Sequence, residues 1–222
     1  MKARLLAVIN KLLAIFTGGR YSLVNTRLYG LYQLSTERKI HQRSLLPLPR
    51  PCRVIIGAGG SSYEGWYTTN EDSLNLAQQS DWDAFFTPGS IDAILAEHVW
   101  EHLTTEDAVT GAALCYRYLK AGGYARIAVP DGLHPNSEYI DYVKPGGSGP
   151  GSDDHKVLYT YRTLADCFAK AGFDVKLLEY FNENHEFQAV DWKPDDGFIE
   201  RSIRFDERNA SGNYGYTSVI ID

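Results

Sequence analysis

Two histidines and a glutamate stand near the middle of the chain at the spacing of a metal site. The stretch "AEHVWEHL", Ala96 to Leu103, contains His98-x-x-Glu101-His102, the H-x-x-E-H pattern of the inverted zinc peptidases. Residues three and four apart share a helix face, so these side chains could converge on one ion. A peptidase needs both histidines on one continuous helix, whereas the apolar run before His98 predicts a strand. The sequence therefore predicts a strand-to-helix junction at His98 and no metallopeptidase.

Glycine and proline residues mark the ends of the helices and strands that position these residues. Strands are predicted within 53–56, 65–69, 72–76, 91–96, 124–130, 174–181 and 216–222, and helices over 99–120 and 161–173, each ended by glycine. Strands that alternate with helices predict an open α/β sheet that is mostly parallel, with helices on both faces. The last two strands have no helical pattern between them, so we expect the final strand to be antiparallel, in a pair at the sheet edge.

Charge is divided unevenly along the 222 residues. Residues 1–50 carry nine Lys or Arg against Glu37 alone, a net charge of +8, and the total of −6 leaves −14 for residues 51–222. An acidic body repels phosphates, which argues against a nucleic-acid partner unless the basic segment binds it. Together with the prolines of "SLLPLPRPC", this predicts a basic, amphipathic helical segment 1–50 ending in a proline-rich linker, followed by one domain, 51–222.

The first helix leaves two interpretations open. Its apolar residues follow helical spacing, with Arg4 and Lys11 on the other side. It either packs on its own domain or on a second subunit, giving a homodimer, or it makes a peripheral membrane contact through residues 1–20. The run is too short and too polar to span a bilayer, and no signal-peptide cleavage site stands out. Three cysteines without a C-x-x-C pair predict a reducing, cytoplasmic location, peripheral at a membrane in the second interpretation.

The glycines after the first strand indicate a close approach of backbone to ligand. Gly57-x-Gly59 follows "RVII" directly, and glycine has no Cβ to obstruct a ligand. Ser62 stands where the dinucleotide fingerprint requires a third glycine. The chain also lacks the G-K-[ST] of a P-loop and the G-x-S-x-G of a hydrolase elbow, so a different nucleoside-type ligand is expected beside the first strand.

Four motifs in order resemble the class I S-adenosylmethionine-dependent methyltransferases, most closely their "type 11" branch. They are "VIIGAGG…EGW", "GSIDAILAEHVWEHL", "YRYLKAGGYARIAVPDG" and "YRTLADCFAKAGF". The resemblance runs from about Cys52 to Phe181 and implies a Rossmann-like fold with S-adenosylmethionine as cofactor. It implies cofactor-binding roles for nine residues: Gly57, Ala58, Gly59, Asn70, Glu71, Asn75, Leu76, Glu97 and His98.

Two asparagines depart from the family pattern. Asn70 and Asn75 stand where the resemblance implies acids, one for the ribose hydroxyls and one for the adenine amino group. An amide accepts hydrogen bonds without the charge that strengthens them. Glu71 replaces the first acid, or cofactor affinity is modest, or the site is degenerate. A structural interpretation is also open, in which both asparagines are turn residues.

Histidines in the segment after "VPDG" are the candidate bases. Methyl transfer from a sulfonium needs a positioned acceptor and a group that removes its proton, for which a near-neutral histidine is suited. His155 is the first candidate and His134 the second.

Glu101 and His102 would hold a divalent ion if one of these histidines supplied a further ligand. The favoured interpretation has no metal, with Glu101 capping the helix and His102 packing under the sheet.

The resulting hypothesis is methyl transfer from S-adenosylmethionine to a hydroxyl or amine of a small-molecule acceptor, such as a saccharide. The alternative, motivated by Asn70 and Asn75, is a non-catalytic methyltransferase-like binding or scaffold protein. The insertion at 182–212, which includes Trp192 and Arg201, is a substrate wall, a dimer surface or a packed cover over the sheet edge.

Overall fold

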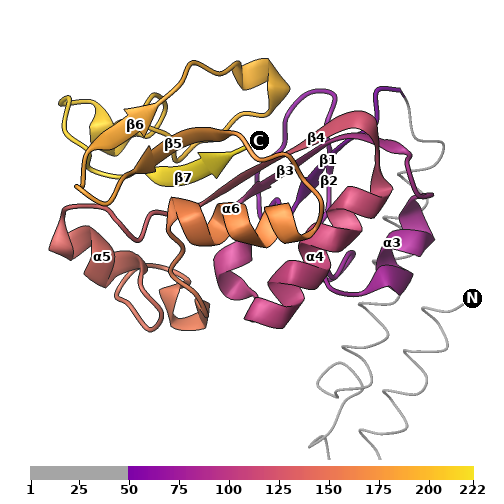
Figure 1. The fold of residues 1–222 in the computed structure, drawn as a ribbon, viewed down its shortest axis with the longest axis horizontal. Helices are drawn as coiled ribbons and strands as arrows, with labels where there is room; N and C mark the ends of the chain where they lie inside the picture. The colour runs from indigo at the N-terminus through magenta and orange to yellow at the C-terminus, as the bar shows by residue number, and fades with distance from the viewer. Residues whose placement is uncertain (1–49) are drawn as a thin grey trace, which may run out of the picture. The chain divides into compact units, whose positions relative to one another are not determined.

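A seven-stranded mixed sheet organises residues 50–222, the part of the chain that this computed structural model describes (Figure 1). The strand order is β2-β1-β3-β4-β7-β5-β6. The strands are β1 (Arg53–Ile56), β2 (Tyr67–Thr68), β3 (Ile91–Glu97), β4 (Leu119–Pro130), β5 (Leu177–Phe181), β6 (Phe187–Ala189) and β7 (Ser218–Ile221). β1 pairs in parallel with β2 and β3, and β3 with β4. β7 runs antiparallel to β4 and β5, and β6 antiparallel to β5. The predicted α/β sheet with an antiparallel final strand is confirmed. The expectation of a mostly parallel sheet holds only for β2-β1-β3-β4, because the other three pairings are antiparallel and the sheet is mixed.

The helices of the described residues gather on one face of the sheet. They are α3 (Gln79–Phe85), α4 (Thr105–Tyr118), α5 (Ser137–Val143) and α6 (Tyr161–Lys170), with 3-10 turns η2 (Trp100–His102), η3 (Ser152–Asp154), η4 (Pro194–Asp196) and η5 (Glu207–Asn209). α4 contacts both α3 and α6, so these three helices form one layer (Figure 1). Thr104 caps α4 by accepting from the Asp107 N–H, and Thr160 and Thr163 form a capping box at α6, which satisfies N–H groups that lack an intrahelical partner.

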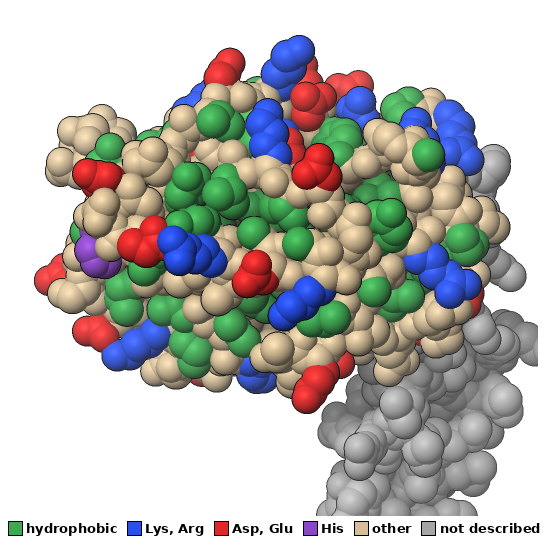
Figure 2. Space-filling model, in the orientation of Figure 1, with side chains coloured by type: hydrophobic (Ala, Val, Ile, Leu, Met, Phe, Trp, Pro, Cys, Tyr) green, Lys and Arg blue, Asp and Glu red, His purple; other side chains and the backbone are tan. Residues whose placement is uncertain are grey.

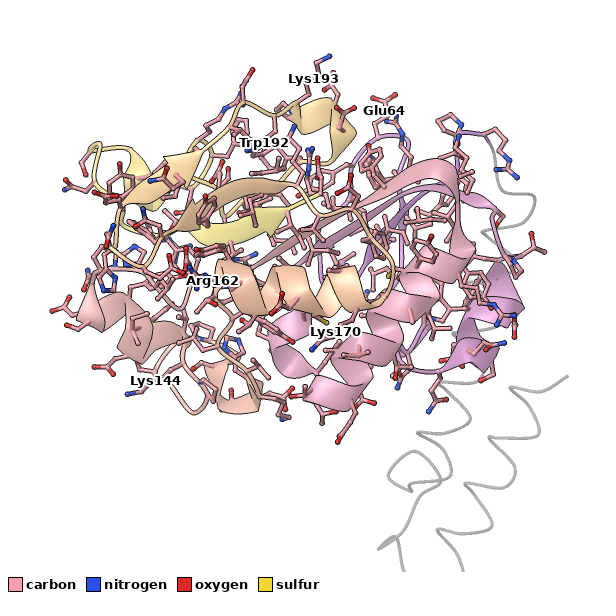
Figure 3. The ribbon with its side chains drawn as sticks, in the orientation of Figure 1. Glu64, Lys144, Arg162, Lys170, Trp192 and Lys193 are labelled. Atoms are coloured by element: carbon pink, nitrogen blue, oxygen red, sulfur yellow. The ribbon has the colours of Figure 1, made fainter. Side chains whose placement is uncertain are left out.

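Irregular chain covers the opposite face. Ile55, Leu95 and Ile220, from β1, β3 and β7, form a cluster with Trp192 and Ile199 of the insertion. Trp192 lies across the sheet from α6 (Figure 3). The expectation of helices on both faces is therefore wrong for the described residues, because this face is sealed by loops and 3-10 turns. The packed-cover interpretation of the insertion is confirmed for Trp192.

Three further predictions about elements are wrong. Residues 72–76 form turns instead of a third strand. The cap residue of α4 is Leu119, and the glycines expected to cap that helix, Gly122 and Gly123, lie within β4. β5 and β7 do pair antiparallel, but β7 lies inside the sheet and the unpredicted β6 forms the edge. In contrast, β3 ends at Glu97 and η2 begins at Trp100, so the junction at His98 is confirmed.

The predictions for residues 1–20, with their membrane or dimer contact, lie outside the described residues, as does most of the proline-rich linker. The described residues 50–222 belong to one compact unit. No helix within 50–222 is both long and apolar enough to cross a bilayer. On the face seen in Figure 2, basic side chains are interspersed with acidic ones instead of forming a continuous basic surface.

Candidate functional site

The cavity that contains most of the predicted cofactor residues lies where the chain passes from one side of β1 to the other. From β1 the chain continues to the neighbouring β2 on one side, and β3 pairs on the other side of β1. Loops that leave adjacent parallel strands in opposite directions open a crevice at the carboxyl ends of the strands, where open α/β sheets bind ligands. A cavity of about 870 Å³ occupies this position. Seven of the nine predicted cofactor residues line it: Gly57, Gly59, Asn70, Glu71, Asn75, Leu76 and His98.

The first turn keeps its backbone open to this cavity. Gly57 and Gly59 have φ of +63° and +57°, a left-handed conformation that glycine adopts without strain. A Cβ on Gly57 would lie 2.5 Å from Cγ2 of Val99, whereas a Cβ on Gly59 would meet nothing within 4 Å. Gly57 is therefore needed for packing, and Gly59 leaves space that a ligand can fill.

The two asparagines shape the loops that bound the cavity. Oδ1 of Asn70 accepts the N–H of Gly59 at 2.7 Å, and Oδ1 of Asn75 accepts the N–H of Ala77 at 3.0 Å. The Asn75 bond is the local bond of a turn residue, whereas the Asn70 bond spans eleven residues and ties the loop after β2 to the glycine turn. The turn interpretation is therefore supported for the Asn75 side chain, and for Asn70 only through its backbone carbonyl, which accepts the Ser73 N–H. The exposed carboxylate of Glu71 also lines this cavity.

Two predicted cofactor residues lie elsewhere. Ala58 and Glu97 line a smaller cavity of about 220 Å³ on the other side of the glycine turn. The Glu97 carboxylate accepts the backbone N–H groups of Glu200 and Arg201 at 3.1 and 2.8 Å, and burial raises its pKa. These contacts fasten the insertion to the end of β3. Direct cofactor contact is thus not supported for Ala58 or Glu97.

His98 lies at the meeting point of three cavities. Its φ of 56° is uncommon for a residue other than glycine. Ser218 Oγ donates to the Arg201 carbonyl, so Nε2 of His98, 3.1 Å from that Oγ, carries the proton. Nδ1 then faces Oε1 of Glu101 at 3.3 Å with its lone pair. Burial, with Arg201 nearby, lowers the His98 pKa well below its usual range, so the ring is neutral.

A further cavity of about 310 Å³ adjoins the 870 Å³ cavity, since His98 and His102 line both. These two are called the second and the first cavity below. The insertion contributes Arg201 and Arg208 to its wall, so the substrate-wall interpretation is supported for Arg201. Arg208 lies over the ring of Tyr216, with its guanidinium carbon 3.6 Å from the ring centre. Sequence reasoning missed Arg208 and Tyr216, because no local pattern places the insertion beside His98.

His155, the first predicted base, lines this second cavity. Its Nδ1 lies 2.6 Å from the Val143 carbonyl, an acceptor, so Nδ1 carries the proton and Nε2 a lone pair. Burial lowers the pKa of His155, which keeps the ring neutral and able to accept a proton or bind a cation.

His134, the second predicted base, does not reach either cavity. It is 3% exposed and stacks on Tyr139. Its Nε2 donates to the Tyr214 carbonyl and its Nδ1 accepts the Asn136 N–H. With both ring nitrogens occupied, His134 has no lone pair for a substrate, and the geometry argues against the role of base.

Glu101 is a buried acid without a hydrogen-bonding partner. Its side chain is 1% exposed, and neither carboxylate oxygen has an aligned hydrogen bond. Burial raises its pKa to about 8. The predicted capping role is wrong, because Thr104 caps α4. His102 does not pack under the sheet either, since it lines both cavities and lies 3.3 Å from Asp154.

The long segment after β4 is tied directly to η2. Lys156 and Val157 donate their N–H groups to the Glu101 carbonyl at 2.6 and 3.2 Å. This pairing brings His155 to Glu101 and His102, and one ligand atom from each of the three lies within 4.8 Å of the others. One carboxylate and two imidazoles form a set that can hold a metal ion.

The sequence matches no protein-family model and no curated protein. Among solved structures, the chain is similar to a SAM-dependent methyltransferase from Archaeoglobus fulgidus, with 20% identity over 87% of this chain and 98% of the other and a TM-score of 0.46. It is also similar to an S-adenosylmethionine-dependent methyltransferase from Mesorhizobium loti, with 11% identity, 85% and 98% coverage and a TM-score of 0.47. A third is a possible histamine N-methyltransferase from Thermotoga maritima, with 15% identity, 90% and 94% coverage and a TM-score of 0.44. At these scores the likeness establishes neither ligand nor activity for this chain.

Proposed function

We propose that this chain transfers a methyl group from S-adenosylmethionine to a hydroxyl or amine of a small molecule. The observation that carries the proposal is the convergence of the motif residues on one cavity. Gly59, Asn70, Leu76 and His98 come from four separate segments, and all line the cavity at the ends of β1, β2 and β3. Convergence of this kind is expected of a binding site and has no explanation in packing alone.

The chemistry of the cavity fits the cofactor. Its volume of about 870 Å³ lies within the range of small-molecule sites, roughly 300–1,000 Å³. We assign the ribose hydroxyls to the carboxylate of Glu71, since the amide oxygen of Asn70 already accepts from Gly59. Leu76 offers an apolar contact for the adenine, and the open backbone of Gly59 admits the methionine part.

The second cavity is the acceptor site in this proposal. Bound S-adenosylmethionine supplies an electrophilic methyl group: a bond forms from the acceptor oxygen or nitrogen to that carbon, and the carbon–sulfur bond breaks with its electron pair left on sulfur. His98 and His102 separate the two cavities and would border the path of the methyl group. In the metal-free protein, Nε2 of neutral His155 is the atom that accepts the proton lost by the acceptor.

Calorimetric titration of the full chain with S-adenosylhomocysteine tests the proposal. We expect saturable binding that weakens in Leu76→Asp, which places a charge against the adenine. Binding should persist in Asp83→Asn, a change of an exposed residue on α3 outside the described cavities. A folded protein that releases no heat on titration would remove the proposal. If S-adenosylhomocysteine binds but no acceptor in a panel of small molecules is methylated, the non-catalytic alternative motivated by Asn70 and Asn75 is favoured instead.

A further inference from the structure

The buried carboxylate of Glu101 has no aligned hydrogen bond, although Nδ1 of His98 lies 3.3 Å from its Oε1. Its side chain is 1% exposed, and both oxygens are without hydrogen bonds. Nearly all buried polar side chains in native proteins are hydrogen-bonded, so an orphaned carboxylate indicates a strained role or an ion. Glu101 is one of the residues that line the acceptor cavity, and its oxygens are shielded from solvent.

The two neighbouring imidazoles are oriented as metal ligands are. Nδ1 of His155 donates to the Val143 carbonyl at 2.6 Å, and Nδ1 of His102 lies 3.3 Å from Oδ2 of Asp154. Histidines that bind metals usually donate their other ring N–H to a backbone carbonyl or a carboxylate, which fixes the tautomer. Here one histidine has each kind of partner, and both rings are left with a lone pair on Nε2.

Spacing and fold bring the three groups together. One oxygen of Glu101 and one nitrogen from each of His102 and His155 lie within 4.8 Å of one another. Ligand atoms at about 2.1 Å from one ion are at most about 4.2 Å apart, so side-chain adjustments of roughly half an ångström close the site. We propose that Glu101, His102 and His155 bind one divalent transition-metal ion at the boundary of the two cavities.

The donor set selects the class of ion. Two imidazoles and one carboxylate suit zinc, iron, cobalt or manganese, whereas magnesium and calcium prefer oxygen ligands alone. Three protein ligands leave coordination positions open, and these face the cavity that also contains Arg201. An ion there would bind an acceptor oxygen and lower the pKa of its hydroxyl. The inference goes beyond the proposed function, because the ion site stands whether or not methyl transfer occurs.

Cobalt(II) titration of the full chain, without any methyl donor, tests the site. After treatment with chelator and dialysis, the protein is titrated with cobalt(II) chloride while the d–d absorption of the bound ion is recorded. We expect one ion per chain and displacement of cobalt by zinc. Glu101→Gln and His155→Gln should each weaken binding by more than about 100-fold, because each removes a ligand.

Two further variants separate ligation from folding. Asp154→Asn changes an exposed side chain and should weaken cobalt binding by about 10–100-fold through the orientation of His102. His185→Asn alters an exposed histidine that lies outside the cluster and should leave binding unchanged. The inference would be overturned if the folded wild-type chain bound no cobalt. It would also be overturned if Glu101→Gln and His155→Gln bound cobalt as tightly as the wild-type chain does. Titration with S-adenosylhomocysteine in chelator gives a separate result, so failure of one proposal is distinguishable from failure of the other.

Discussion

Substitution of Gly59 by alanine separates the needs of the fold from those of the cofactor. Gly59 has φ of +57°, and a non-glycine residue in this conformation costs about 1–2 kcal/mol. The added methyl meets no atom within 4 Å, so no packing penalty is added. It does occupy the cavity wall that Gly59 forms. If the methyl costs about 1.4 kcal/mol of contact with the cofactor, affinity for S-adenosylhomocysteine falls tenfold.

Gly89→Ala is the matched control for this substitution. Gly89 has φ of +71°, an added Cβ there also meets nothing within 4 Å, and the residue lies outside the described cavities. Denaturant unfolding should show the same loss of stability in both variants. Calorimetry should show tenfold or greater loss of affinity in Gly59→Ala alone. The reasoning is refuted if Gly59→Ala, folded, binds S-adenosylhomocysteine as tightly as Gly89→Ala does.

Three further changes test other parts of the account. Asn70→Ala removes the acceptor of the Gly59 N–H, so it should lower the unfolding free energy by about 1 kcal/mol and weaken S-adenosylhomocysteine binding in calorimetry. Asn70→Asp retains the acceptor and should keep both the stability and the affinity. Burial raises the pKa of Asp131 to about 6 from 3.8, so its contribution to stability is complete below pH 3.8 and lost as pH rises through 6. The unfolding free energy should fall by about 3 kcal/mol in total over this pH range, and urea curves of Asp131→Asn should lack this decrease; an equal decrease in Asp131→Asn counts against it. Arg126→Met removes a buried guanidinium that bonds Asp222 at 2.7 and 2.8 Å, and should lower the urea-unfolding free energy by about 3–5 kcal/mol; a loss below 1 kcal/mol contradicts this role.

Features governed by neighbouring residues could be predicted from the sequence. The β-branched run before Gly57 and the apolar run before His98 give β1 and β3, because each is a short buried segment ended by a change of backbone conformation. The glycine turn and the crevice beside it follow from the same pattern. The nine cofactor residues come from the resemblance to the methyltransferases, and seven of them line one cavity; whether they bind the cofactor remains a prediction.

Features governed by distant contacts could not be predicted. The resemblance implies a cofactor-binding role for Glu97, but its carboxylate accepts backbone N–H groups of the insertion, more than a hundred residues further along the chain. His134 and His155 carry the same chemistry in the same segment. Only tertiary hydrogen bonds distinguish them. Nε2 of His134 donates to the Tyr214 carbonyl, whereas His155 is brought to Glu101 by the backbone bonds that Lys156 and Val157 donate to the Glu101 carbonyl.

The most direct test of the central claim is a crystal structure of the full chain with S-adenosylhomocysteine at saturating concentration. The account predicts the ligand in the cavity at the ends of β1, β2 and β3, with its ribose beside Glu71 and its sulfur directed toward His98. Ligand bound at any other place on a folded chain, or no ligand bound at all, would contradict the account.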